Sequence, residues 1–188
     1  MRIGVLAVQG AFIEHEKVMQ SLGCDCVELR QKSDIVSLDG LILPGGESTV
    51  QNKLLHELDM FDALKDMIKG GVRTLATCAG LILLAERISN DKRSAFATLP
   101  VTVKRNAYGR QLGSFRTRSD FKGIGDVDMT FIRAPYIEKV ADGVKILSVV
   151  DQKIVGVEYK NQIGLSFHPE LDKDDSIHRF FIDQIGTK

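Results

Sequence analysis

The sequence predicts an α/β fold, a three-layer sandwich with a largely parallel central sheet and added antiparallel strands. Two observations predict it. Short β-rich runs alternate with helical patterns in the first half of the 188-residue chain, which is typical of a doubly wound sheet covered by helices on both faces. After residue 95 the strand-like runs are separated by turns rather than long helices, which indicates mixed or antiparallel pairing beside the parallel core.

The elements of the first half follow from apolar runs bounded by turn and cap residues. Strands are expected at residues 3–8, 27–29, 41–43 and 72–77. Helices are expected at residues 12–22, from residue 48 onward, at 60–68 and at 81–85. Gly23 stands where a helix C-cap belongs. Gln51, three residues after Ser48, completes a capping-box pattern at the start of the second helix.

Strand-like runs dominate the second half of the chain. They lie at residues 101–105, 129–132, 145–150, 154–159 and 163–167. Residues 174–185 are expected to close the chain as a helix, because their apolar side chains fall on one face. No repeat, low-complexity segment or linker interrupts this order, so we expect a single domain over residues 1–188.

Composition excludes several classes of protein. Lys+Arg and Asp+Glu both number 25, which argues against nucleic-acid or membrane binding driven by bulk charge. The first residues run into a strand rather than a leader, and the longest mostly apolar stretch, residues 75–85, is far short of the ~20 residues that span a bilayer. An odd count of 3 cysteines fits a reducing compartment. We therefore expect a cytoplasmic protein without metal or other cofactor.

The sharpest local motif is Ala76-Thr77-Cys78-Ala79-Gly80, between an apolar strand and an apolar helix. It is similar to a nucleophile elbow, in which a tight strand-to-helix turn lifts the nucleophile clear of the sheet. The following helix N-terminus favours a thiolate. The alternative is an ordinary buried cysteine at a strand end, since Ala76 stands where the usual elbow has glycine.

The motif Ser166-Phe167-His168-Pro169-Glu170 favours the catalytic interpretation of Cys78. Residues two apart in extended chain point the same way, which would place the imidazole of His168 beside the carboxylate of Glu170. Pro169 stiffens that arrangement. A carboxylate so placed can hold the histidine tautomer while the other ring nitrogen faces the thiol. The alternative is a surface turn.

A third motif, Leu43-Pro44-Gly45-Gly46-Glu47-Ser48-Thr49, follows an apolar strand. Its glycine pair exposes backbone N–H groups near the carboxyl edge of the sheet, where ligands bind in open α/β folds. Such groups could stabilise an oxyanion; a phosphate loop lacks its lysine here, and a simple turn remains the alternative. Outside these motifs, His15, His56 and His178 are expected at the surface or on helix flanks.

Together these motifs resemble the class I (triad) glutamine amidotransferases, and among them the glutaminase subunits of pyridoxal 5′-phosphate synthase, over nearly the whole chain. The elbow and the His-x-Glu motif mark the superfamily. The narrower group is marked by Gln9-Gly10-Ala11, Gly45-Gly46-Glu47-Ser48-Thr49, Val103-Lys104-Arg105-Asn106 followed by Gly109-Arg110-Gln111, and Ile132-Arg133-Ala134-Pro135. The resemblance implies a flavodoxin-like version of the predicted fold.

The resemblance also implies residue roles. Cys78 would be the nucleophile, His168 the general acid/base and Glu170 the orienting carboxylate. Contacts to glutamine would come from Gly46, Glu47, Ser48, Arg105, Ile132 and Arg133. The oxyanion would be held by backbone N–H groups of the Gly45-Gly46 loop, Gly46 above all, and of Ala79. Ala76 departs from the family pattern, which puts the tightness of the elbow in question.

The implied activity is hydrolysis of L-glutamine to L-glutamate and ammonia. By resemblance, the ammonia passes to a (β/α)8-barrel synthase subunit in a large heteromeric complex that makes pyridoxal 5′-phosphate (vitamin B6). Three alternatives stay open at this point: a cysteine peptidase or stress protein that shares the elbow, a non-catalytic binding module, and an amidotransferase that serves an imidazole- or purine-forming acceptor.

Overall fold

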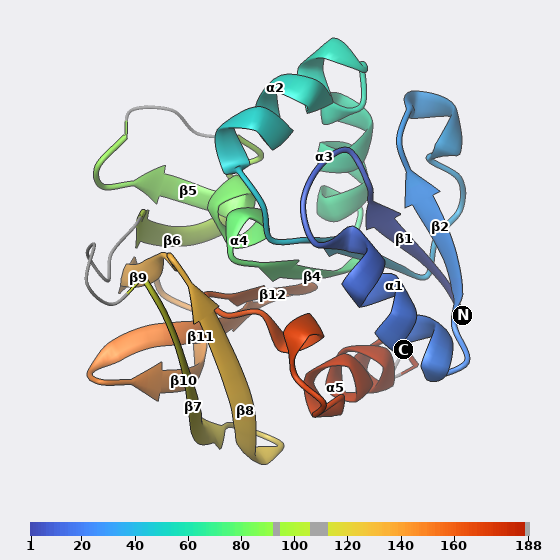
Figure 1. The fold of residues 1–188 in the computed structure, drawn as a ribbon. Helices are drawn as coiled ribbons and strands as arrows, with labels where there is room; N and C mark the ends of the chain where they lie inside the picture. Colours follow the sequence, from blue (N-terminus) through green and yellow to red (C-terminus); the bar gives the residue numbers. More distant parts are fainter. Residues whose placement is uncertain (92–94, 106–112, 187–188) are drawn as a thin grey trace.

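A computed structural model describes residues 1–91, 95–105 and 113–186, and its core is a long twisted sheet between two layers of helices (Figure 1). The parallel half of the sheet has the order β2-β1-β3-β4-β12. These strands are β1 (Arg2–Leu6), β2 (Asp25–Leu29), β3 (Gly40–Leu43), β4 (Arg73–Thr77) and β12 (Gln162–Leu165). Both β3 and β12 are buried at every position, as expected of strands covered on two faces.

The sheet continues beyond β12 with mainly antiparallel pairs, in the order β11-β9-β6-β5. These strands are β11 (Lys153–Tyr159), β9 (Tyr136–Val140), β6 (Leu99–Lys104) and β5 (Ala85–Ile88), and β10 (Lys145–Val150) pairs with β11 on a side branch. A separate hairpin joins β7 (Ser114–Phe121) to β8 (Gly125–Ile132). The predicted parallel sheet with antiparallel additions is therefore confirmed.

Helices cover the two faces of the parallel half (Figure 1). One core lies under α2 (Ser48–Glu57), α3 (Phe61–Lys69) and α4 (Ala79–Leu84), and the other under α1 (Phe12–Ser21), α5 (Ser176–Ile185) and the β7–β8 hairpin. Two short 3₁₀ turns, η1 (Lys32–Asp34) and η2 (Pro169–Leu171), complete the elements. Because side chains alternate along a strand, Ile42 joins the second core whereas Leu41 and Leu43 join the first. Burying each such side chain stabilises the fold by ~1.5–3 kcal/mol.

Several sequence expectations differ from the structure. The expected strands omit β5, β7 and β9, and the helix expected at 81–85 begins at Ala79 and gives way to β5 at Ala85. The capping box expected of Ser48 and Gln51 is wrong. The N-cap is Glu47, whose side chain accepts from the backbone N–H of Thr49, because the Gln51 amide donates instead to the carbonyls of the two neighbouring loops.

The topology gathers four connections at one edge of the sheet. Because β1, β3, β4 and β12 are parallel neighbours, the segments after their carboxyl ends leave the sheet together, where open α/β sheets bind ligands. The three motifs converge at this edge, which is therefore the expected position of the functional site.

In the described part of the chain, no helix combines the length and apolarity needed to cross a membrane.

Candidate active site

Cys78 sits in a strained turn between β4 and α4. Its backbone has φ 47° and ψ −98°, a conformation that a non-glycine residue adopts at a cost of ~1–3 kcal/mol. Its N–H donates to the carbonyl of Leu165 (2.8 Å), which anchors the turn to β12. The side chain is only 8% exposed, yet it lines a cavity of about 370 Å³ together with His168. Strain of this kind is typical of functional positions.

Ala76 does not prevent the elbow from forming. It is a fully buried residue of β4, paired with Leu43 and Gly164 on either side. The tight contact falls instead at Gly80, where an added Cβ would lie 2.0 Å from the carbonyl oxygen of Leu43. The tightness of the elbow, which Ala76 put in question, is therefore set two residues after Cys78, at Gly80.

Replacing Gly80 with alanine is therefore expected to lower the free energy of unfolding by about 3 kcal/mol or more, since a backbone carbonyl cannot rotate away as a side chain can. Gly186→Ala is the matched control, because the nearest atom to its added Cβ is 3.8 Å away; it should change stability by less than about 0.5 kcal/mol. Urea denaturation of both variants measures the difference. Similar midpoints would contradict the close approach.

His168 and Glu170 form a buried pair on the segment after β12. Nδ1 of His168 lies 2.7 Å from Oε1 of Glu170, and each residue is 6% exposed. The imidazole and the carboxylate are close together, as expected, but the extended backbone expected to bring them together is wrong. β12 ends at Leu165, and the pair is closed by the 3₁₀ turn of η2 rather than by extended chain. The N–H of His168 donates to the Thr130 carbonyl (2.8 Å), which ties this turn to β8.

The charges around His168 favour its imidazolium form. Burial lowers the pKa of His168, but hydrogen bonds and charge interactions with Cys78 and Glu170 outweigh burial and raise the pKa to about 10. Burial acts to raise the pKa of Glu170, whereas His15 and His168 lower it, and the net shift is downward. The site thus places an imidazolium between a carboxylate and a thiol, the order of groups found where a histidine serves a thiol nucleophile.

The Gly45-Gly46 loop packs directly against this pair. A Cβ on Gly45 would meet Cε1 of the His168 ring at 2.2 Å, so only glycine fits there. The Gly45 N–H donates to the hydroxyl oxygen of Thr77 (3.0 Å). Gly45 is therefore engaged as a donor, and Gly46 is the residue of this loop that fits the expected oxyanion role.

The loop after β1 holds the loop after β3 in place. The N–H of Ala11 donates to the Gly45 carbonyl (3.0 Å), and the N–H of Glu47 donates to Oε1 of Gln9 (2.8 Å). Gln51 adds a side-chain hydrogen bond to the Gln9 carbonyl (3.0 Å). Gln9 also lines the cavity that contains Cys78.

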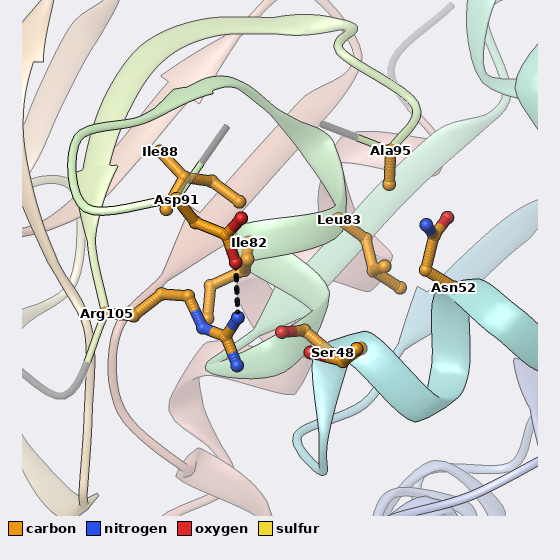
Figure 2. Close-up of a pocket in the computed structure, with 9 residues that line it drawn as sticks. Ser48, Asn52, Ile82, Leu83, Ile88, Asp91, Ala95 and Arg105 are labelled. Atoms are coloured by element: carbon orange, nitrogen blue, oxygen red, sulfur yellow. Dashed lines mark hydrogen bonds and ion pairs between the residues drawn. The ribbon is translucent and has the colours of Figure 1, made fainter. Parts of the chain in front are cut away.

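Arg105 reaches the cavity from the end of β6. Its guanidinium forms ion pairs with Asp91 (3.0 Å) and Glu47 (3.1 Å), and Figure 2 shows it beside Ser48 and Ile82. Arg105, Glu47 and Ser48 also line the cavity at Cys78. The part of the family motif that follows Arg105, at residues 106–111, lies outside the described residues.

Residues at the end of β8 line another side of the cavity at Cys78. Ile132 and Arg133 line the same cavity as Cys78, and Arg133 has a positive φ of 42°. The structure therefore brings to this cavity the expected residues Gly46, Glu47, Ser48, Cys78, Arg105, Ile132, Arg133 and His168. Glu170 lies behind His168, and Ala79 begins α4 directly after Cys78.

Two buried histidines behind Glu170 were not expected from the sequence. His15 and His178 are both 0% exposed, so the surface or helix-flank positions expected for them are wrong; His56 is exposed on α2, as expected. The spacing of Phe12, His15 and Met19 contains the signal, since residues three and four apart share one helix face. The fold, with the three motifs gathered at the carboxyl edge of its sheet, is that of a class I glutamine amidotransferase.

Comparisons with known proteins agree with that class. Residues 5–187 match the SNO glutamine amidotransferase family, and the chain belongs to this family. The pyridoxal 5′-phosphate synthase subunit PdxT of Desulfitobacterium hafniense (strain Y51) is 66% identical over 187 residues, which cover 99% of this chain and 94% of that protein. PdxT of Haemophilus influenzae (strain PittEE) is 51% identical, covering 97% of each. The crystal structure of a glutamine amidotransferase aligns with a TM-score of 0.93 at 37% identity, covering 98% of this chain and 99% of that one.

Proposed function

We propose that this chain, as one domain over residues 1–188, hydrolyses L-glutamine to L-glutamate and ammonia with Cys78, His168 and Glu170 as its catalytic triad. The observation that supports it best is the pairing of a strained, cavity-lining thiol with a buried His–Glu pair in one site. Membership of a glutamine amidotransferase family supports glutamine as the substrate.

The reaction begins when the Cys78 thiolate attacks the side-chain carbonyl carbon of glutamine. The carbonyl oxygen becomes an oxyanion, held by the backbone N–H groups of Gly46 and Ala79. His168 gives its proton to the departing nitrogen, the C–N bond breaks, and ammonia leaves a glutamyl thioester on Cys78. His168 then takes a proton from water, the resulting hydroxide attacks the thioester, and glutamate is released with the thiolate restored.

The charges at the mouth of the cavity suit an amino acid zwitterion. Arg105 and Arg133 offer cationic groups for the α-carboxylate of glutamine, and the Glu47 carboxylate offers a partner for its α-ammonium group. The Glu47 side chain of the Arg105–Glu47 ion pair is about half-exposed. A bound zwitterion can therefore exchange this ion pair for two others, one between Arg105 and its carboxylate and one between Glu47 and its ammonium group. Ile132 would cover the methylene groups.

The ammonia would pass to a pyridoxal 5′-phosphate synthase, because the relatives are named as subunits of that enzyme. Free ammonia in water is protonated and loses its nucleophilicity, so direct delivery to a second active site is favoured. The partner we propose is a (β/α)8-barrel synthase subunit in a large heteromeric complex of the cytoplasm. The three free cysteines of this chain are consistent with a reducing compartment.

We expect weak glutaminase activity from the isolated chain and at least about tenfold stimulation by the synthase subunit, because one oxyanion donor brought into place is worth roughly 10²–10³ in rate. Glutamate release is measured with and without equimolar partner, and an unrelated barrel protein serves as the control. Equal turnover by the chain alone, with the synthase subunit and with the unrelated barrel protein would refute the coupling. It would not refute glutamine hydrolysis itself, which the Cys78→Ala variant tests.

A further inference from the structure

Two buried histidines extend the line of polar groups behind Glu170. Nε2 of His15 lies 3.3 Å from Oε2 of Glu170, and Nδ1 of His15 lies 3.0 Å from Nε2 of His178. His15 comes from α1 and His178 from α5, so the two helices of one layer meet here. Both side chains are fully buried, and the chemistry described above uses neither of them.

The surroundings of His15 select one of its tautomers. Oε2 of Glu170 is buried and needs a donor, because an unsatisfied buried carboxylate oxygen is costly. A proton on Nε2 of His15 lies between the hydroxyl oxygen of Thr77 at 3.2 Å and Oε2 of Glu170 at 3.3 Å, so it is the donor that faces this oxygen. Nδ1 of His15 is then left to accept from the Nε2–H of His178. Two polar atoms of this group have no hydrogen-bond partner, Oε2 of Glu170 and Nδ1 of His178. This assignment gives the carboxylate oxygen a facing donor at 3.3 Å, and it leaves Nδ1 of His178 as a bare acceptor rather than a buried donor.

Burial keeps both histidine rings neutral, against the pull of the carboxylates that face them. Burial lowers the pKa of His15, Glu170 and Glu14 act to raise it, His168 acts to lower it, and the net shift is downward. Burial and His15 lower the pKa of His178 to about 3, although Glu170 and Asp175 oppose this. A neutral donor can fix the position of a carboxylate without neutralising its charge. The carboxylate therefore stays available to His168.

We propose that His15 is a positioning residue for the glutaminase reaction: it donates from Nε2 to Glu170 and so holds the carboxylate that supports the His168 imidazolium. His178, by donating to Nδ1 of His15, fixes the tautomer that makes this possible. Thr77, whose hydroxyl oxygen lies 3.2 Å from Nε2 of His15, shares the same proton. The proposal rests on the function proposed above, since it acts through the triad.

The first test compares His15→Leu with His15→Gln. Leucine removes the donor, so kcat for glutamine should fall about 10- to 100-fold, the size expected for losing a hydrogen bond to a buried charge, with KM changed less than about threefold. In His15→Gln the side-chain amide N–H stands where the histidine Nε2 stood. The kcat of His15→Gln should therefore be at least about tenfold higher than that of His15→Leu. His178→Phe should fall between the two. His56→Gln is the control, because His56 is exposed on α2.

A second readout separates positioning from a merely structural role. If His15 acts through Glu170, then His15→Leu should slow the reaction of Cys78 with iodoacetamide at pH 7 by about tenfold, because less thiolate–imidazolium pair is present. In a Glu170→Gln background the same substitution should have almost no further effect. Mass spectrometry of the Cys78 peptide gives the rate even where turnover is too low to measure.

Parent-like kcat and labelling in His15→Leu would overturn the proposal, as would an equal loss in His15→Gln or an effect that adds fully to that of Glu170→Gln. Circular dichroism and melting curves establish that each variant is folded. If His15→Leu does not fold, His15→Gln and His178→Phe still decide the question. None of these outcomes touches the proposed function, which fails separately if Cys78→Ala retains activity.

Discussion

Cys78→Ala is expected to lower glutamine hydrolysis by at least ~10⁴-fold, because removing the nucleophile of a triad abolishes the covalent route and leaves only binding and oxyanion stabilisation. The cavity should remain, since alanine is smaller than cysteine and no neighbour has to move. Glutamine binding is therefore expected to persist. Glutamate release measured in the presence of the synthase subunit, and calorimetric titration with glutamine, test the two halves of this expectation.

Cys24→Ala and Cys26→Ala are the matched controls for that experiment. Both cysteines pack at the edge of the second core near β2, and burial raises the pKa of the Cys26 thiol to about 11. Each control should keep essentially full turnover. Hydrolysis near the parent rate in Cys78→Ala, or a comparable loss in either control, would reject Cys78 as the nucleophile.

Glu170→Gln is expected to cost roughly 10²- to 10⁴-fold in kcat, in line with the effect of neutralising the orienting carboxylate of other triads. It should also change the pH profile. Glu170 raises the pKa of His168, so its removal must lower that pKa from about 10 toward the ordinary 6.5. The imidazolium that protonates the leaving ammonia is then lost at lower pH, and the alkaline limb of kcat/KM should move to lower pH.

Glu57→Gln, at an exposed position of α2, controls for the loss of a negative charge elsewhere. Its profile of kcat/KM against pH should overlay that of the parent protein. If the alkaline limb of Glu170→Gln stayed in place, or moved to higher pH, Glu170 would not be the group that holds the proton on His168.

The parallel half of the fold could be predicted because its signals are local. Continuous apolar runs mark strands covered on both faces, and β3 at 40–43 and β4 at 73–77 were each expected to within one residue. The hairpin strand β7 gave no such signal, because Arg116, Arg118 and Asp120 alternate with half-buried residues and leave few apolar positions. β5 was hidden by the apolar run of α4, which continues into its first residue.

The site was predictable where it consists of short motifs and not where it depends on packing. Cys78 and the His168–Glu170 pair lie in contiguous sequence patterns with a known chemical reason for each residue type. His15 and His178 come together only through the docking of α1 against α5, a contact that joins residues 163 positions apart. Likewise, nothing in the sequence alone indicated that the Gly45 N–H would be taken by Thr77.

The hydrogen bonds between the loops after β1 and β3 have a consequence for local unfolding. Ala11 is bound to Gly45, and Glu47 and Gln51 are both bound to Gln9, so neither loop can open while the other stays closed. They form one cooperative unit, whose opening exchanges all three contacts for water at once. A protein that docks on the first turn of α1 and holds the loop after β1 closed would therefore also hold the loop that carries the Gly46 amide.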